Sequence, residues 1–221
     1  MIKLSKKIYV LFLLIISICL FHFYEINAIN LPLSGKVIYL DSGHGGRDPG
    51  SIYKNVYEKD INLAITYALK DILEGEGCKV YMTRYGDYDL SSNNVAARKM
   101  SDLTNRAKII NKSEADMYIS IHLNATTSAT WKGAQVFFDD VNEDNKKIAT
   151  VFQNQLNKDL GNNRKISEIK GMRFNRLVKV PGVLVEAGFL SNPNDRYLLQ
   201  KDYYQRRIAK SITRAVINYY K

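Results

Sequence analysis

Two histidines and two glutamates stand where they could act together on a substrate. His44 lies in a glycine-flanked loop after the apolar run Val37–Leu40, and His122 ends a second apolar run. Glu58 begins a helical pattern, and Glu186 follows a short apolar run. Two imidazoles and one carboxylate are a common ligand set of catalytic zinc. A further carboxylate can carry a proton from water to a leaving group. The four residues therefore indicate metal-assisted hydrolysis.

Each residue also has an ordinary structural explanation. A single histidine often serves only packing or the surface, and Glu58 would complement the dipole of the helix that it begins. Glu186 could be a buried acid that is paired with an arginine. Spacing alone leaves the metal site and these structural roles both open. Other nucleophiles have less support, because no Gly-x-Ser-x-Gly elbow surrounds a serine and Cys78 has no obvious histidine partner.

Alternating strand and helix patterns predict an α/β domain with a largely parallel sheet and helices on both faces. Functional residues of such sheets gather at the carboxyl ends of the strands. We therefore expect His44, His122 and Glu186 at one edge of the sheet, each at or just past a strand end. The predicted strands span 36–41, 79–83, 116–122, 133–138 and 183–185. One predicted helix begins at residue 58, and three more span 98–111, 143–160 and 203–219.

The N-terminal segment has the layout of an export signal. Lys3, Lys6 and Lys7 precede an apolar run from Ile8 to Phe23, as in a signal peptide or a membrane anchor. The N-terminal segment could be cleaved after Ala28, or it could be retained as a membrane anchor. The expected organisation is therefore an export signal or anchor at 1–28, a linker at 29–35 and a catalytic domain at 36–221, with extracytoplasmic action.

Composition narrows the function further. The chain has 221 residues and a net charge of +10, which suits one compact domain with a basic surface. The positive charge is spread along the chain and no nucleic-acid-binding motif accompanies it, so we expect no nucleic-acid partner. The two cysteines, Cys19 and Cys78, leave no disulfide pair inside the domain.

Four segments carry a resemblance to a known family. Leu40–Gly46 resembles the opening motif of the zinc-dependent N-acetylmuramoyl-L-alanine amidases, and Glu58–Leu63 resembles the start of their metal-binding helix. Ser120–Ala125 is similar to the second histidine motif, and Val185–Asn192 to the catalytic-glutamate motif. The resemblance implies a zinc-exopeptidase-like α/β fold, one Zn²⁺ bound by His44, Glu58 and His122, and Glu186 as the catalytic acid and base. The implied reaction is hydrolysis of the amide between N-acetylmuramic acid and L-alanine in peptidoglycan.

Within this family, the chain resembles the germination-specific amidases of spore-forming bacteria, on Leu31–Lys36, Arg98–Leu103 and the N-terminal signal. This implies action on spore cortex, where the stripped muramic acid becomes muramic-δ-lactam. Ser42 departs from the proline that is usual in the family. Targeting would come from the membrane segment, if it is uncleaved, or from an unidentified partner protein. A non-catalytic wall-binding relative and a zinc exopeptidase acting on peptides are the competing interpretations.

Overall fold

The computed structural model describes residues 6–26, 31–92 and 96–221. The chain divides into two compact units, Met1–Leu31 and Pro32–Lys221. The first contains helix α1 (Lys6–Ile26). Within the described ranges, we find no helix whose length and apolar character would let it cross a membrane. The expected cleavage point at Ala28 lies outside the described residues, as does the expected start of the linker at residue 29.

The second unit is built on a six-stranded sheet with the order β4-β1-β5-β8-β6-β7. Neighbouring strands pair in parallel, except that β8 and β6 are antiparallel. The prediction of a largely parallel sheet is therefore confirmed. The strands are β1 (Val37–Ser42), β4 (Lys79–Met82), β5 (Met117–Asn124), β6 (Gln135–Phe138), β7 (Ser167–Glu168) and β8 (Gly182–Phe189).

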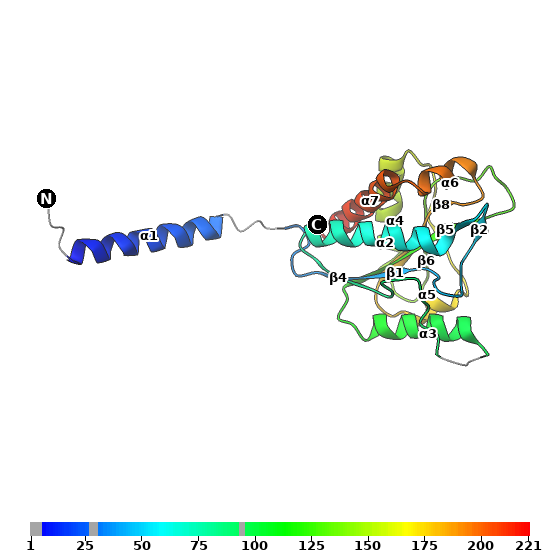
Figure 1. Ribbon diagram of the computed structural model, residues 1–221, viewed down its shortest axis with the longest axis horizontal. Coiled ribbons are helices and arrows are strands. Elements are labelled where there is room, and N and C mark those ends of the chain that lie inside the picture. The colour runs from blue at the N-terminus through cyan, green and yellow to red at the C-terminus, as the bar shows by residue number, and fades with distance from the viewer. Residues whose placement is uncertain (1–5, 27–30, 93–95) are drawn as a thin grey trace. The chain divides into compact units, whose positions relative to one another are not determined.

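Helices cover both faces of this sheet (Figure 1). One face carries α2 (Glu58–Gly75), α4 (Asn145–Leu160) and α7 (Asp202–Tyr220), and the other carries α3 (Arg98–Asn111) and α5 (Arg173–Leu177). A short helix, α6 (Pro193–Leu199), precedes α7. The helical spacing that predicted α2 is explained by burial, because Ile61, Ile65 and Leu69 are part of the larger core.

Strand β1 contributes to two separate cores, as a strand buried on both faces must. Ile38 and Leu40 belong to the large core beneath α2, α4 and α7. Tyr39 points the other way and belongs to a smaller core with Tyr118 and Phe174. Because successive side chains alternate between faces, this strand holds its position from both sides. The loop that follows it, which carries His44, therefore starts from a rigid point.

Two strands continue further than the sequence predicted. β5 runs two residues beyond His122, with an irregularity in its pairing between His122 and Asn124, and β8 runs three residues beyond Glu186. The predicted ends at these two residues are therefore wrong. The physical reason is that Leu123, Ala187 and Phe189 are buried and extend the apolar alternation. The hairpin of β2 (Ile52–Tyr53) and β3 (Val56–Tyr57), along with β7, α5 and α6, was also not predicted.

Candidate metal centre

The loop after β1 adopts a backbone that few side chains tolerate. His44 has φ of 62°, and Gly45 and Gly46 have φ of 132° and 57°. A left-handed histidine is uncommon and persists when its surroundings hold it in place. Arg106 does so, because its Nη2 donates a hydrogen bond to the His44 carbonyl at 2.5 Å. Gly43 is required for a different reason: a Cβ there would lie 2.3 Å from the imidazole of His122.

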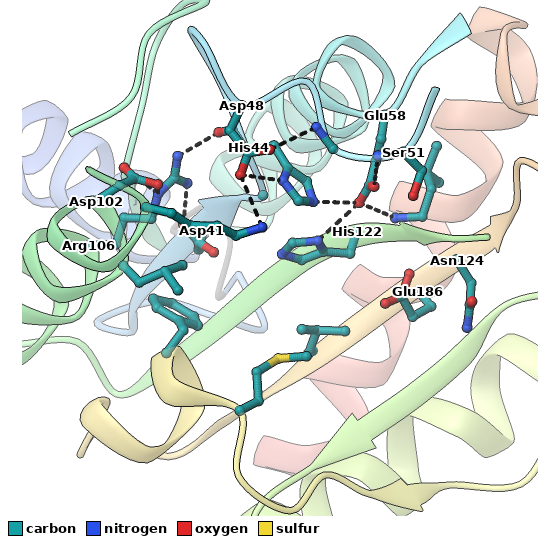
Figure 2. Close-up of a pocket in the computed structure, with 18 of the residues that line it drawn as sticks. Asp41, His44, Asp48, Ser51, Glu58, Asp102, Arg106, His122, Asn124 and Glu186 are labelled. Carbon is teal, nitrogen blue, oxygen red and sulfur yellow. Dashed lines mark hydrogen bonds and ion pairs between the residues drawn. The ribbon is translucent and has the colours of Figure 1, made fainter. Parts of the chain in front are cut away.

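The structure brings His44, Glu58 and His122 together (Figure 2). Glu58 Oε1 lies 3.1 Å from His44 Nε2 and 3.0 Å from His122 Nδ1. One ligating atom from each residue falls within 4.8 Å of the other two. The same Oε1 accepts a hydrogen bond from the Leu123 N–H, and Oε2 accepts one from Ser51. Glu58 is therefore fixed between the two histidines as well as at the start of α2.

The charges of this cluster are strongly coupled. Burial alone would lower the pKa of His44, but hydrogen bonds with Asp48 and Glu58 outweigh burial and raise it to about 9. Burial would raise the pKa of Glu58, yet the hydrogen bonds with His122 and His44 hold it far below its usual range. Without a metal ion, the cluster is therefore an ionised carboxylate that holds a proton on a histidine. A dication can take the place of that proton.

Glu186 faces the same site from the neighbouring strand β8, where it pairs in register with His122 (Figure 2). Its Oε2 is buried and has no hydrogen-bond partner among the described residues. Burial raises its pKa to about 7, with His122 and His44 lowering it and Glu58 raising it. The described residues include no arginine within ion-pair distance of Glu186. A carboxylate with this pKa can both accept and donate a proton near neutral pH.

All four residues line one cavity of about 460 Å³. The donor set of two imidazole nitrogens and one carboxylate oxygen fits a catalytic zinc site, which leaves a coordination position open for water or substrate. The second ring nitrogen of His44, Nδ1, lies 3.0 Å from Asp48 Oδ2. Such a carboxylate fixes the orientation of a metal-binding imidazole. The cluster therefore carries the donor atoms of a metal site and a carboxylate that orients one of its imidazoles.

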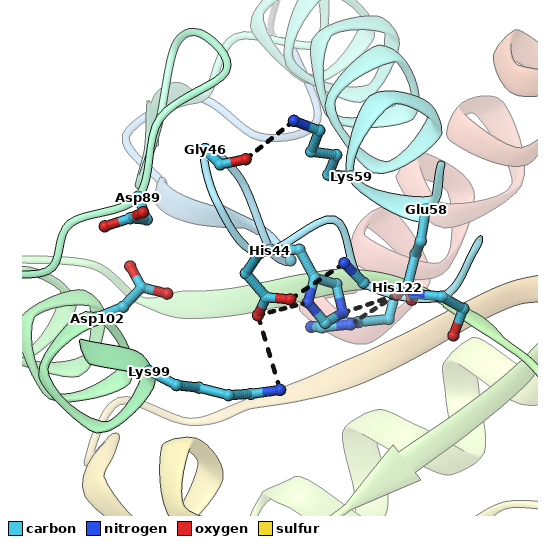
Figure 3. Close-up of polar contacts among 12 residues, drawn as sticks. His44, Gly46, Glu58, Lys59, Asp89, Lys99, Asp102 and His122 are labelled. Carbon is cyan, nitrogen blue, oxygen red and sulfur yellow. Dashed lines mark hydrogen bonds and ion pairs between the residues drawn. The ribbon is translucent and has the colours of Figure 1, made fainter. Parts of the chain in front are cut away.

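Sequence reasoning missed the residues that hold these ligands in place. Asp48 stood in the glycine-rich loop, four residues after His44, and that spacing was the available signal. Lys99, which reaches Asp48 at 3.7 Å from the first turn of α3, gave no signal (Figure 3). Asn62 lies one helical turn after Glu58 and donates hydrogen bonds to Gly43 O and Glu58 Oε1.

Arg106 anchors the loop through a buried charge network. Its Nη1 lies 2.9 Å from Asp41 Oδ1 and its Nε lies 3.0 Å from Asp102. Both carboxylates are almost wholly buried. Removing one member of such a network leaves its partners as unpaired buried charges, which costs about 3–5 kcal/mol.

We therefore expect Arg106→Met to lower the free energy of unfolding by about 3–5 kcal/mol in urea denaturation. Arg206→Met is the matched control, since the exposed Arg206 pairs with the exposed Asp202 at 3.4 Å. That exposed pair is worth less than about 1 kcal/mol. Equal stability of the two variants would contradict the assigned role of Arg106.

Ser42, which stands where the resemblance expects proline, is fully buried, and its hydroxyl has no partner among the described residues. Burying an unsatisfied hydroxyl costs about 1–3 kcal/mol. We expect Ser42→Ala to leave the free energy of unfolding unchanged or to raise it by about 1 kcal/mol. A loss of stability in urea denaturation would show that the hydroxyl has a partner.

Comparisons with known proteins show the family of the chain. The family model described as N-acetylmuramoyl-L-alanine amidase matches residues 38–218. The germination-specific N-acetylmuramoyl-L-alanine amidase of Bacillus subtilis is 44% identical over 195 residues, covering 86% of this chain and 82% of the relative. The amidase LytC of the same organism is 27% identical and covers 88% of this chain, which spans 38% of LytC.

Solved structures agree with the sequence relatives. The CwlD amidase from Clostridioides difficile, solved in complex with the GerS lipoprotein, superposes with a TM-score of 0.79 at 38% identity, covering 84% of this chain and 98% of that one. The catalytic domain of the amidase CwlV from Bacillus (Paenibacillus) polymyxa gives 0.73 at 27% identity, covering 83% and 97%. The chain therefore belongs to the N-acetylmuramoyl-L-alanine amidase family, and it is a peptidoglycan-hydrolysing enzyme of the cell wall.

Proposed function

We propose that this amidase is zinc-dependent, with one Zn²⁺ bound by His44, Glu58 and His122 and with Glu186 as the catalytic acid and base. The observation that carries the proposal is the convergence of three ligating atoms within 4.8 Å beside a cavity that Glu186 also lines. The sequence resemblance assigns the same roles to the same residues. Zinc, when bound, supplies Lewis-acid activation of a water molecule and of the amide carbonyl.

Glu186 performs the proton transfer in this scheme. Its carboxylate accepts the proton of the attacking water and passes it to the nitrogen of L-alanine as the C–N bond breaks. The lactyl group keeps the new carboxyl, and the stem peptide leaves with a free amine. The raised pKa of Glu186, about 7, suits a group that must hold and release a proton in one cycle.

The order of the strands suggests how the substrate lies. The metal-binding histidines stand on or after β1 and β5, Glu186 stands on β8, and β6 and β7 follow. A second hollow over β6 and β7 shares Glu186 and Met172 with the main cavity. Because the leaving nitrogen must reach Glu186, we assign the stem peptide to this hollow and the muramic acid to the opposite side of the metal.

We further propose spore cortex peptidoglycan as the substrate, with the stripped muramic acid going on to muramic-δ-lactam. The support is the 44% identity to a germination-specific amidase. Residues 36–221 are then the catalytic domain, and residues 1–28 act as an export signal or anchor that delivers it outside the cytoplasm. The C. difficile amidase was solved with a lipoprotein, which supports a protein partner for this chain.

Digestion of purified cortex and vegetative peptidoglycan, followed by mass spectrometry, tests the proposal. We expect free L-alanyl stem peptides and unsubstituted muramic acid, with no release after chelation and recovery on adding zinc. Cleavage within the stem peptide would favour a zinc exopeptidase. Zinc and glycan binding without cleavage would favour a non-catalytic relative. Activity that survives chelation and complete zinc removal would refute the metal assignment.

A further inference from the structure

Arg84 lies two residues after the end of β4, and its side chain is buried beneath the two segments that carry His44 and Glu58. The residue is 1% exposed. Its guanidinium donates to four main-chain carbonyls: Nε to Ser42 at 3.0 Å, Nη1 to Gly86 at 2.9 Å, and Nη2 to Gly43 at 3.1 Å and Lys59 at 2.7 Å. Four of the five N–H donors of the guanidinium therefore bond to the main chain, which sets its position.

The decisive contacts are the two that Nη2 makes. Gly43 immediately precedes His44, and Lys59 immediately follows Glu58. A single nitrogen atom thus joins the main chain beside one candidate ligand to the main chain beside another. Since a guanidinium is planar and rigid, the two carbonyls cannot move apart without breaking a hydrogen bond. This contact therefore constrains the separation of His44 and Glu58.

The buried positive charge of Arg84 is harder to account for than that of Arg106. Arg106 is matched by Asp41 and Asp102, whereas no carboxylate of the described residues lies within ion-pair distance of Arg84. Burial lowers the pKa of Arg84, and Arg106 lowers it further. A buried cation without a carboxylate partner is costly. The folded protein keeps this cation where backbone carbonyls of both ligand-bearing segments can accept its hydrogen bonds.

Neighbouring contacts join the two segments at other points. Lys59 Nζ donates to Gly46 O at 3.0 Å on the outer side of the loop (Figure 3), and it pairs with the exposed Asp87. Asn62 joins Gly43 to the Glu58 side chain through a longer hydrogen bond of 3.2 Å to Gly43 O. A Cβ at Gly45 would lie 2.9 Å from Arg84 Cδ, so the loop closes directly over the arginine.

We infer that Arg84 is a positioning residue, which presets the distance between His44 and Glu58 and thereby sets the affinity of the site for zinc. The inference rests on the proposed zinc site. It predicts that replacing Arg84 lowers the affinity for zinc. The zinc-bound protein should therefore lose more stability than the zinc-free protein does. A merely structural arginine would lower the stability of the zinc-free and zinc-bound proteins equally.

The test compares Arg84→Lys, Arg84→Met, Arg84→Ala and wild type as full chains. Lysine keeps the positive charge but lacks the planar guanidinium with its several N–H donors. Arg196→Lys is the matched control, because Arg196 is also buried, and its guanidinium donates to the Leu190 carbonyl and stacks on the Tyr53 ring, neither of which adjoins a candidate ligand. Zinc affinity is measured by competition with a chromophoric chelator, and the zinc-induced rise in unfolding midpoint is measured alongside.

We expect the Arg84 variants to bind zinc about 10–100-fold more weakly, as for other residues that orient metal ligands. Arg196→Lys should keep the wild-type zinc affinity. Guanidinium ion added to Arg84→Ala should restore part of the zinc affinity. Wild-type affinity in Arg84→Lys would overturn the inference, even if Arg84→Met failed to fold. A wild type that bound no zinc would instead overturn the proposed site, and this inference with it.

Discussion

Glu186→Gln is expected to keep stoichiometric zinc and to lower kcat by about 10²–10⁴-fold, the usual contribution of a general acid and base. Glutamine has nearly the same shape, but its amide cannot take a proton from water. Glu186 is not one of the three residues whose ligating atoms converge, so the metal should stay. Zinc content by elemental analysis and turnover on a defined muramoyl peptide separate the two effects.

The pH profile adds a second measure of the same residue. As a base, Glu186 must be ionised, so wild-type kcat/KM should rise with pH through its pKa. Burial places that pKa at about 7 in the zinc-free protein, and a bound dication would move it lower. The residual activity of Glu186→Gln should lack this acidic limb.

A suitable control is Glu114→Gln, which removes an exposed carboxylate elsewhere on the domain. It should keep the wild-type kcat and pH profile. Loss of zinc from Glu186→Gln would show that Glu186 is a ligand. Wild-type turnover in that variant would remove it from the reaction altogether.

The fold was largely predictable because its strongest signals are periodic. The stripe of Ile61, Ile65 and Leu69 required a helix, and the run Val37–Leu40 required a buried strand. The ends of β5 and β8 were missed because the residues after His122 and Glu186 are again apolar. The polar residues His122 and Glu186 therefore did not mark the ends of their strands.

The supporting residues were harder to predict than the candidate ligands. Arg84 and Arg106 donate hydrogen bonds to backbone carbonyls in the segment 42–44, and Arg84 also donates to the Lys59 carbonyl. These acceptors lie 25–64 positions away from the arginines in the sequence. A pattern of residue types carries no information on such contacts without an alignment or a structure. Asp48 is the exception, because its separation of four residues from His44 could have suggested a carboxylate paired with an imidazole.

Glu58→Gln is expected to weaken zinc binding by more than about 100-fold, which is beyond the effect of losing a residue that only orients a ligand. The carboxylate supplies the one negative charge among the three converging side chains, and its Oε1 lies within 3.1 Å of both histidines. Glutamine offers a neutral oxygen in its place. Chelator competition gives the affinity, and activity should fall in proportion to zinc occupancy.

Stability alone cannot report this loss, since Glu58 also accepts buried hydrogen bonds from Ser51 and Leu123. The informative quantity is the zinc-induced rise in unfolding midpoint, which should nearly vanish in Glu58→Gln and persist in the surface control Glu114→Gln. An unchanged zinc-induced rise would exclude Glu58 as a ligand.

Proton competition gives the sharpest distinction between a ligand and a neighbour. In the zinc-free wild type, Asp48 and Glu58 raise the pKa of His44 to about 9, so zinc must displace a proton below that pH. Apparent affinity should therefore rise with pH and level off near the pKa of His44. Glu58→Gln removes one of the two groups that hold this proton, so the plateau should begin at lower pH while the affinity there stays weak. A ligand role requires both changes; a plateau that moved without loss of affinity would make Glu58 only a partner of His44.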